Sequence, residues 1–224
     1  MASIDLGILP ACEFVVDNAR SVRVEMPVLQ SLARQWVDQP FEVPGWDSDI
    51  HWSGTPQQTL HYVLLLDALN FCFWVDPGQV RWEVEYQGQS FNGYKALSVA
   101  LRRALEEGVE LTSATTLANL SAPQLAHILR GKGAIPLLEQ RLEHANQVGR
   151  QLIRLWQGDF AQAVDSCGGS ALALTSLIGH DFPCFYDVSR YQGRDIPLYK
   201  RAQITVVDIA GSLQFQGLGE FRDI

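Results

Sequence analysis

The stretch that decides the fold runs from Thr55 to Phe73 and reads TPQQTLHYVLLLDALNFCF. A threonine followed by a proline is typical of a helix start. The Thr side chain accepts a backbone N–H at the N-cap, and proline at the first helical position removes no hydrogen bond. The apolar residues that follow predict a helix from Pro56 to about Phe73. It is one of many helical patterns in a chain that reads mostly as helix.

Other segments repeat this preference for helix. The range 40–56 reads instead as a long loop, rich in proline and glycine, that carries two tryptophans and His51. Alternating apolar residues around Gln87-Gly88 predict a β-hairpin, and a second Tyr-Gln-Gly turn occurs at 191–193. Ile204–Val207 is ambiguous between helix and strand. Further helices are predicted at 25–37, 95–108, 123–131, 135–158, 170–180 and 198–214. We therefore predict a single mainly helical domain over residues 1–224 with one or two small β-hairpins.

The overall charge narrows the classes of partner. The chain has 224 residues, of which 47% are hydrophobic and 19% charged, and a formal net charge of −8 with a pI of about 5.0. Proteins that grip duplex nucleic acid by its phosphates usually carry a basic surplus, and an anionic membrane surface attracts basic segments. We therefore expect neither a nucleic acid nor a membrane as a direct partner. One small anion, held by a single Lys or Arg, remains compatible with this charge.

The cysteines and histidines indicate no metal site. There is no C-x-x-C pair and no H-x-x-x-H pair, so the spacing expected of zinc ligands is absent from the sequence. We expect reduced thiols, no metal and no cofactor. The first residues, with Asp5 and Glu13 inside their apolar part, are a poor match to a signal peptide, and no apolar run is long enough for a membrane span. These observations predict a cytoplasmic protein. The cysteines are Cys12, Cys72, Cys167 and Cys184.

Asp67 and Asn70 interrupt the apolar stretch, and a buried carboxylate must be paired, hydrogen-bonded or next to a wet pocket. On a helix that continues to Phe73, both residues would share a face with Phe71 and Trp74. Two interpretations stay open. The polar pair forms a structural network, or it lines a pocket in which an aromatic face stacks on a flat ring.

A second polar interruption lies in the segment 198–214. Lys200 and Arg201 precede an apolar run, and Asp208 follows two turns later. The pattern fits an internal ion pair, or a cation that receives a phosphate or carboxylate of a ligand, where charge-assisted bonds are strongest. Asp187, behind two aromatic residues, reads as a residue that caps a turn. His127, His144 and His180 read as solvated helix positions.

Several segments together resemble the queuosine salvage protein family, and the resemblance spans nearly the whole chain. These segments are LDALNFCFW, YQGQSFNGYKAL, LTSATTLANLS, FPCFYDVSRYQGRDIPLYKRAQI and GLGEFRDI. The resemblance implies an N-glycosidase that hydrolyses queuosine 5′-phosphate and releases the base queuine, which is salvaged for tRNA modification. It also implies a fold similar to helix-hairpin-helix DNA glycosylases, although the L-P-G-x-G-like turn of those enzymes is not visible here.

The resemblance also assigns residues to the site. Asp223 would be a catalytic carboxylate that approaches the queuine base with Phe221, and Lys200 would lie near the 5′-phosphate. Members of the family continue past the segment resembling GLGEFRDI into a helical portion with a motif like F-A-D-Y-R. We associate the main catalytic aspartate with that motif and expect it beyond Ile224. The substrate-binding residues implied are His51, Asn70, Phe71, Trp74, Tyr199, Lys200, Phe221 and Asp223.

Two other functions remain compatible with the residues themselves. The chain could be a nucleotide-binding protein without turnover, or a helical protein-interaction module whose aromatic residues form core or interface. No phosphate-binding loop of the G-x-x-x-x-G-K-[ST] type and no G-x-S-x-G elbow occurs to favour another class of enzyme. The release of free queuine from queuosine 5′-phosphate distinguishes the three hypotheses.

Overall fold

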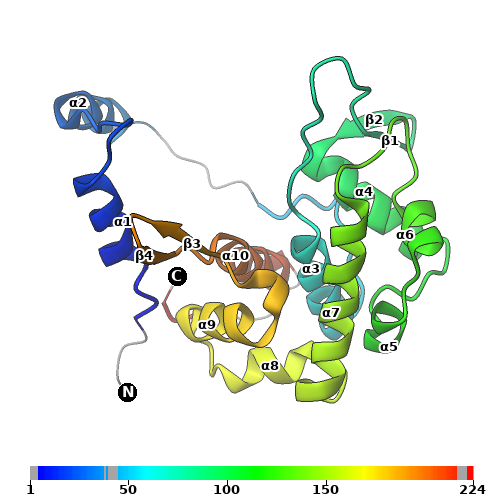
Figure 1. Ribbon diagram of the computed structural model, residues 1–224. Helices are drawn as coiled ribbons and strands as arrows, with labels where there is room; N and C mark the ends of the chain where they lie inside the picture. Colours follow the sequence, from blue (N-terminus) through cyan, green and yellow to red (C-terminus); the bar gives the residue numbers. More distant parts are fainter. Residues whose placement is uncertain (1–4, 38, 40–44, 216–220, 224) are drawn as a thin grey trace. The chain divides into compact units, whose positions relative to one another are not determined.

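The computed structural model describes residues 5–37, 39, 45–215 and 221–223. This part of the chain is mainly helical and contains two small antiparallel β-hairpins, as predicted (Figure 1). The chain divides into two compact units. The first comprises Met1–Gly45 with Val188–Leu198, and the second comprises Trp46–Asp187 with Tyr199–Ile224. The prediction of one domain over 1–224 therefore stays a prediction, and each unit is described by itself.

The first unit contains two helices and one hairpin. Helix α1 (Ile8–Asp17) packs against the hairpin strand β4 (Arg194–Pro197), which pairs with β3 (Val188–Tyr191). The Tyr191 hydroxyl donates to the Asn18 carbonyl at 2.9 Å, and the Arg194 guanidinium lies 4.8 Å from the centre of the Phe14 ring. Helix α2 (Met26–Val37) confirms the helix predicted at 25–37, whereas α1 was not predicted.

The second unit holds the remaining elements. Its helices and strands are α3 (Pro56–Ala68), β1 (Glu83–Tyr86), β2 (Gln89–Asn92), α4 (Gly93–Glu106), α5 (Ala114–Ala118), α6 (Ala122–Ile128), α7 (Leu138–Trp156), α8 (Phe160–Ser166), α9 (Ala171–Asp181), the 3₁₀ turn η1 (Pro183–Phe185) and α10 (Lys200–Phe215). Predicted helices correspond to α3, α4, α6, α7, α9 and α10, while the short α5 and α8 were not predicted. The ambiguous Ile204–Val207 is helical.

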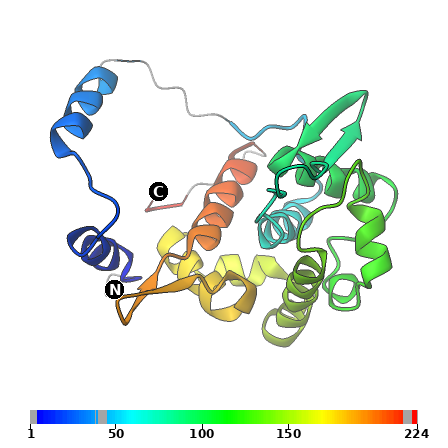
Figure 2. The ribbon, with the colours of Figure 1, turned by 45° about the horizontal axis from the view of Figure 1, so that its top comes forward.

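Helix α3 is the centre of the second unit. Every residue from Thr59 to Ala68 is buried, as expected for a helix that is apolar on all sides. It packs against α4, α7, α8 and α10, and α10 runs beside it in both ribbon views (Figures 1 and 2). Thr55 caps its start as predicted, in a reciprocal capping box with Gln58, and Pro56 occupies the first turn.

The end of α3 was predicted wrongly. The helix ends at Ala68 instead of continuing to about Phe73, and the chain from Asn70 to Trp82 has no regular structure. The carbonyls that a longer helix would use internally are bound from elsewhere. The Arg201 guanidinium donates to the Ala68 carbonyl at 3.1 Å, and the Arg141 guanidinium donates to the Leu69 carbonyl. The argument that Asn70, Phe71 and Trp74 share one helical face therefore fails.

Both predicted hairpins are confirmed, and both turn at a Gln-Gly pair. The φ angles are +49° and +76° at Gln87 and Gly88, and +47° and +82° at Gln192 and Gly193. Positive φ at both central residues is the geometry that lets a two-residue turn follow the twist of the strands. On β1 the buried Val84 faces the core, and it pairs with Phe91 of β2.

In the described ranges of the chain, no helix is both long enough and apolar enough to cross a membrane. The four cysteines are free thiols, and of these Cys184 alone is buried.

Replacing Gly149 by Ala is expected to lower the free energy of unfolding by about 2–3 kcal/mol. A Cβ at Gly149 of α7 would lie 2.2 Å from the Ala118 backbone nitrogen and 2.5 Å from the Ala114 carbonyl oxygen of α5, so the helices must separate. The matched control is Gly211→Ala in α10, whose Cβ would meet, among the described residues, the Trp46 ring at 3.9 Å and nothing closer. Urea denaturation measures both, and equal midpoints for the two variants would refute the expectation.

Candidate active site

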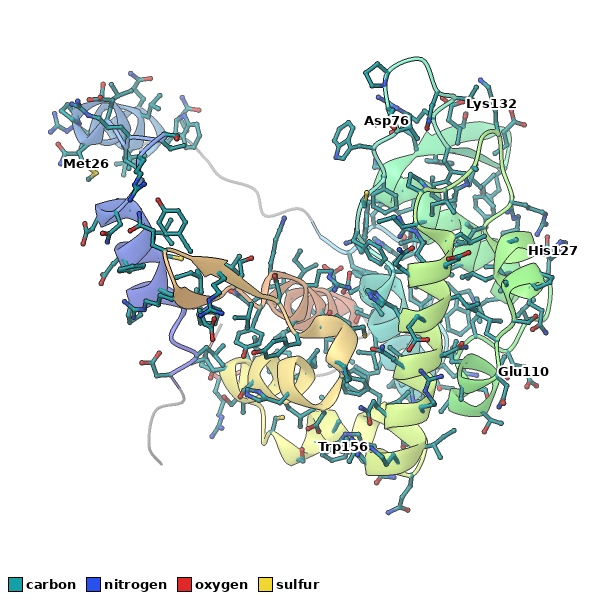
Figure 3. The ribbon with its side chains drawn as sticks, viewed as in Figure 1. Met26, Asp76, Glu110, His127, Lys132 and Trp156 are labelled. Atoms are coloured by element: carbon teal, nitrogen blue, oxygen red, sulfur yellow. The ribbon has the colours of Figure 1, made fainter. Side chains whose placement is uncertain are left out.

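Two acidic side chains face the interior between α3 and α10 of the second unit. Asp67 lies in the last turn of α3 and is fully buried, and Asp208 lies on α10 and is half-buried. Neither forms an ion pair with a Lys, Arg or His in the described residues. Figure 3 shows that Glu110 and His127 lie on the opposite side of this unit, away from α10.

Asp67 is a carboxyl group with few partners. Its Oδ1 lies 3.5 Å from the Asn70 amide nitrogen, and its buried Oδ2 has no hydrogen-bond partner among the described residues. Burial raises the pKa of Asp67 well above its ordinary value, and the charge of Asp208 raises it further. Asn70, Thr205 and Arg201 act in the opposite direction. The environment therefore favours the protonated carboxyl.

Asp208 is joined to α4 through a tyrosine. The Tyr94 hydroxyl lies 3.3 Å from Asp208 Oδ2. Burial raises the pKa of Asp208 to about 6, although the hydrogen bond from Tyr94 lowers it. A carboxyl group with such a pKa exchanges a proton close to neutral pH, as general acids and bases do.

His51 reaches the same tyrosine from the loop before α3. Its Nδ1 lies 2.8 Å from the Asp47 carbonyl oxygen, and its Nε2 lies 2.9 Å from the Tyr94 hydroxyl. The Trp46 ring stacks on the imidazole with ring centres 3.9 Å apart and planes at 20°. His51 is 7% exposed, and burial lowers its pKa. The loop prediction is confirmed for the described residues 45–55.

Phe71 lies among cationic side chains after the end of α3. The Arg141 and Arg201 guanidinium carbons lie 4.4 Å and 5.4 Å from the centre of its ring, and the His144 ring lies 4.9 Å away at a tilt. His144 is half-buried and its Nδ1 lies 3.0 Å from the Ala68 carbonyl oxygen, so the prediction that it is a solvated position is wrong. Arg141, Tyr94 and His144 were not singled out as site residues from the sequence.

The internal ion pair considered for the start of α10 is absent from the described residues. Arg201 donates to the backbone carbonyls of Ala68 and Cys184. Lys200 is exposed, and its backbone N–H donates to Asp187 Oδ2 at 3.1 Å, so Asp187 caps this helix start. Tyr199 is buried, with its ring against Gly179.

Of the other predicted site residues, Trp74 belongs to the irregular segment and is 80% exposed. Asp223 lies at the N-terminus of α9, where its carboxylate accepts hydrogen bonds from the Ser170 hydroxyl at 2.7 Å and from the Ala171 backbone N–H at 2.5 Å. The hydrogen bond from Ser170 is the main reason that the pKa of Asp223 is lowered. Phe221 is half-buried.

The predicted site residues fall into separate groups according to their contacts in the structure. These contacts join His51 to Asp208 through Tyr94, and Asn70 and Phe71 to the end of α3, whereas the contacts of Asp223 are with α9. Searched over the described ranges only, the chain has no group of three or more His, Cys, Asp or Glu side chains able to hold a metal ion.

Comparison with known proteins identifies relatives of this chain. The family model described as "Queuosine salvage protein" matches residues 50–224. The chain is similar to proteins named "Queuosine 5'-phosphate N-glycosylase/hydrolase", and the proteins of three organisms serve as examples. The protein of Sphaerobacter thermophilus is 38% identical over 219 residues, which cover 98% of this chain and 67% of the relative. Those of Bos taurus and Mus musculus are 32% and 34% identical, over 96% of this chain and 65% of each relative. The chain thus spans about two thirds of the length of these relatives.

Proposed function

The chain belongs to the queuosine salvage protein family, and from that premise we propose that it hydrolyses the N-glycosidic bond of queuosine 5′-phosphate and releases queuine. The names of its relatives support this activity and this substrate. Its partner would then be a small nucleotide. The free thiols fit a reducing, cytoplasmic location, and the helical second unit is compatible with a fold like that of helix-hairpin-helix DNA glycosylases.

The observation that carries the proposal is the contact of His51 with Tyr94 and of Tyr94 with Asp208, in a chain of this family. Breaking the bond between C1′ and the base develops positive charge on the sugar, which a fixed carboxylate stabilises. Asp223 has a lowered pKa and is therefore ionised at neutral pH, so at the base it would accept a hydrogen bond. Asp208, with a pKa raised to about 6, is suited to hold and give up a proton.

The leaving base adds a second requirement. Queuine is a 7-deazapurine and has no N7 to protonate, so its departure must depend on hydrogen bonds at other edges. We propose that Asp223 and Asn70 supply them. Phe71, Trp74, Tyr199 and Phe221 would stack on or cover the nucleotide, with His51 beside them. The cationic surroundings of Phe71 support its place in the binding wall.

Incubation of the purified protein with queuosine 5′-phosphate tests the proposal, with free queuine measured by liquid chromatography and mass spectrometry. Release of queuine that is lost in Asp223→Asn supports it. Binding of the nucleotide, seen as a thermal shift, without release would support the nucleotide-binding alternative. Absence of both binding and release would overturn the proposal and favour a protein-interaction module.

Replacing Lys200 by Ala is expected to raise KM for queuosine 5′-phosphate by about tenfold or more while leaving KM for the free nucleoside unchanged, because a charge-assisted bond to the phosphate is lost. Lys200 is exposed at the start of α10, whereas the neighbouring Arg201 is bound to carbonyls. The control is Lys95→Ala, an exposed lysine in the first turn of α4. An equal effect of Lys200→Ala on both substrates would remove the phosphate role.

A further inference from the structure

Three polar groups from three segments form a continuous chain of hydrogen bonds. His51 Nε2 lies 2.9 Å from the Tyr94 hydroxyl, and that hydroxyl lies 3.3 Å from Asp208 Oδ2. His51 comes from the loop before α3, Tyr94 from α4 and Asp208 from α10. The tyrosine has a single proton for two neighbours, so the protonation states of the outer groups depend on each other.

His51 determines the direction of the hydrogen bonds at one end of this row of three groups. His51 Nδ1 lies 2.8 Å from the Asp47 carbonyl oxygen, which only accepts hydrogen bonds, so Nδ1 must carry a proton. In a neutral imidazole Nε2 is then the acceptor, and the Tyr94 hydroxyl must donate to it. The tyrosine oxygen then offers only lone pairs to Asp208, so a hydrogen bond forms only if Asp208 is protonated and donates.

The opposite arrangement contains the same number of protons. If Asp208 is ionised, Tyr94 donates to it, and Nε2 must carry a proton that it donates to the tyrosine oxygen. The two arrangements interconvert when Asp208 gives its proton to Tyr94 and Tyr94 gives its own to His51. Loss of one proton from either arrangement leaves a neutral His51 beside an ionised Asp208, with one hydrogen bond missing.

We infer that Tyr94 is a positioning residue that makes His51 and Asp208 hold one proton between them and release it as a single unit. The role of the shared proton in catalysis rests on the proposed function. In that role, the shared proton keeps Asp208 ready to donate a proton during hydrolysis. Hydrolysis itself adds the hydroxyl of one water to C1′ and its proton to the base, so the proton count of the three groups is the same before and after turnover.

Burial and nearby charges set where the shared proton rests. Burial lowers the pKa of His51 and raises that of Asp208, so burial acts towards a neutral imidazole and a protonated Asp208, whereas a hydrogen bond donated by Tyr94 acts towards an ionised Asp208. Other titratable or charged groups also influence the pKa values of His51 and Tyr94. They are Asp47 in the loop, Tyr62 and Asp67 on α3, and Arg102 on α4. Arg201 on α10 acts on Asp67.

The test compares Tyr94→Phe with Tyr62→Phe, which removes another buried hydroxyl, one that lies 2.9 Å from Ser98 Oγ. NMR of the protein with labelled histidine and aspartate side chains follows His51 and Asp208 as the pH changes. In the wild type and in Tyr62→Phe, both side chains are expected to respond at one common pH. In Tyr94→Phe they are expected to respond at two separate pH values. Separate responses in the wild type, or a common response in Tyr94→Phe, would overturn the inference.

The dependence of queuine release on pH gives a second readout. The pH of half-maximal activity is expected to shift by at least about one unit in Tyr94→Phe and to stay unchanged in Tyr62→Phe. An unchanged profile in Tyr94→Phe would remove the role in turnover. The NMR titration needs no substrate. If the wild type releases no queuine, the proposed function fails, while the shared proton is still decided by the titration.

Discussion

Replacing Asp67 by Asn is expected to make the protein more stable near neutral pH and to reduce queuine release by about 100-fold. Asp67 is fully buried and its Oδ2 lacks a hydrogen-bond partner in the described residues, so an ionised carboxylate is disfavoured there. An amide has similar shape and no charge. Activity falls because the amide cannot exchange a proton beside Asp208.

The stabilisation should depend on pH with a definite sign. The pKa of Asp67 is raised in the folded protein, so the unfolded chain ionises first as pH rises above the ordinary value of 3.8. Folding then requires that Asp67 either takes up a proton or is buried as a charged carboxylate. The free energy of unfolding of the wild type therefore falls as the pH rises above 3.8. The difference between Asp67→Asn and the wild type should therefore be small near pH 4 and grow towards neutral pH.

Urea denaturation at several pH values measures this difference, and Asp165→Asn provides the control because Asp165 is exposed on α8. A gain of about 1 kcal/mol or more near neutral pH is expected for Asp67→Asn, and almost none for the control. If Asp67→Asn instead destabilises the protein most at neutral pH, Asp67 is a stabilising anion and the interpretation of this site is wrong.

Replacing Arg141 by Met is expected to lower the free energy of unfolding by about 3–5 kcal/mol and to impair nucleotide binding. Arg141 on α7 is fully buried, and its guanidinium donates to the backbone carbonyls of Pro136, Leu69, Phe71 and Cys72. Methionine fills a similar volume but leaves these carbonyls unpaired, which releases the segment that carries Asn70 and Phe71.

The control is Arg154→Met on the same helix, since Arg154 is exposed and its nearest polar partner is Gln151. Arg141→Lys keeps the charge but loses the planar fork, so it is expected to fold with intermediate stability and a raised KM. Thermal and urea denaturation with circular dichroism measure both. Equal stability of Arg141→Met and Arg154→Met would show that the carbonyls find other partners, and would contradict the role assigned to Arg141.

Local signals predicted the parts of the fold that depend on neighbouring residues. The capping box at Thr55, the Gln-Gly turns and the stop of α4 near Gly108 are all readable within a few residues. The end of α3 is not readable in this way. No glycine or proline occurs from Leu69 to Asp76, and the residues that bind the carbonyls of Ala68 and Leu69, Arg201 and Arg141, lie far along the chain.

The candidate site shows the same limit. Asp67, Asn70 and Asp208 were noticed because polar residues interrupt apolar runs, and His51 was assigned by family resemblance. Tyr94 carries no local signal, because a tyrosine at the start of an amphipathic helix is ordinary. Its importance arises only when the loop before α3 and helix α10 bring His51 and Asp208 to its hydroxyl. The roles in the site that the resemblance assigns all stay predictions; they concern His51, Asn70, Phe71, Trp74, Tyr199, Lys200, Phe221 and Asp223.

The placement of Asp67 and Asp208 on different helices has a thermodynamic consequence. Their mutual repulsion arises only when α10 docks against α3, so in mildly acid solution that docking step draws protons from the solvent. Refolding in two buffers with different ionisation enthalpies should therefore release different amounts of heat. Helix assembly in this protein is thus an acid–base reaction as well as a packing event.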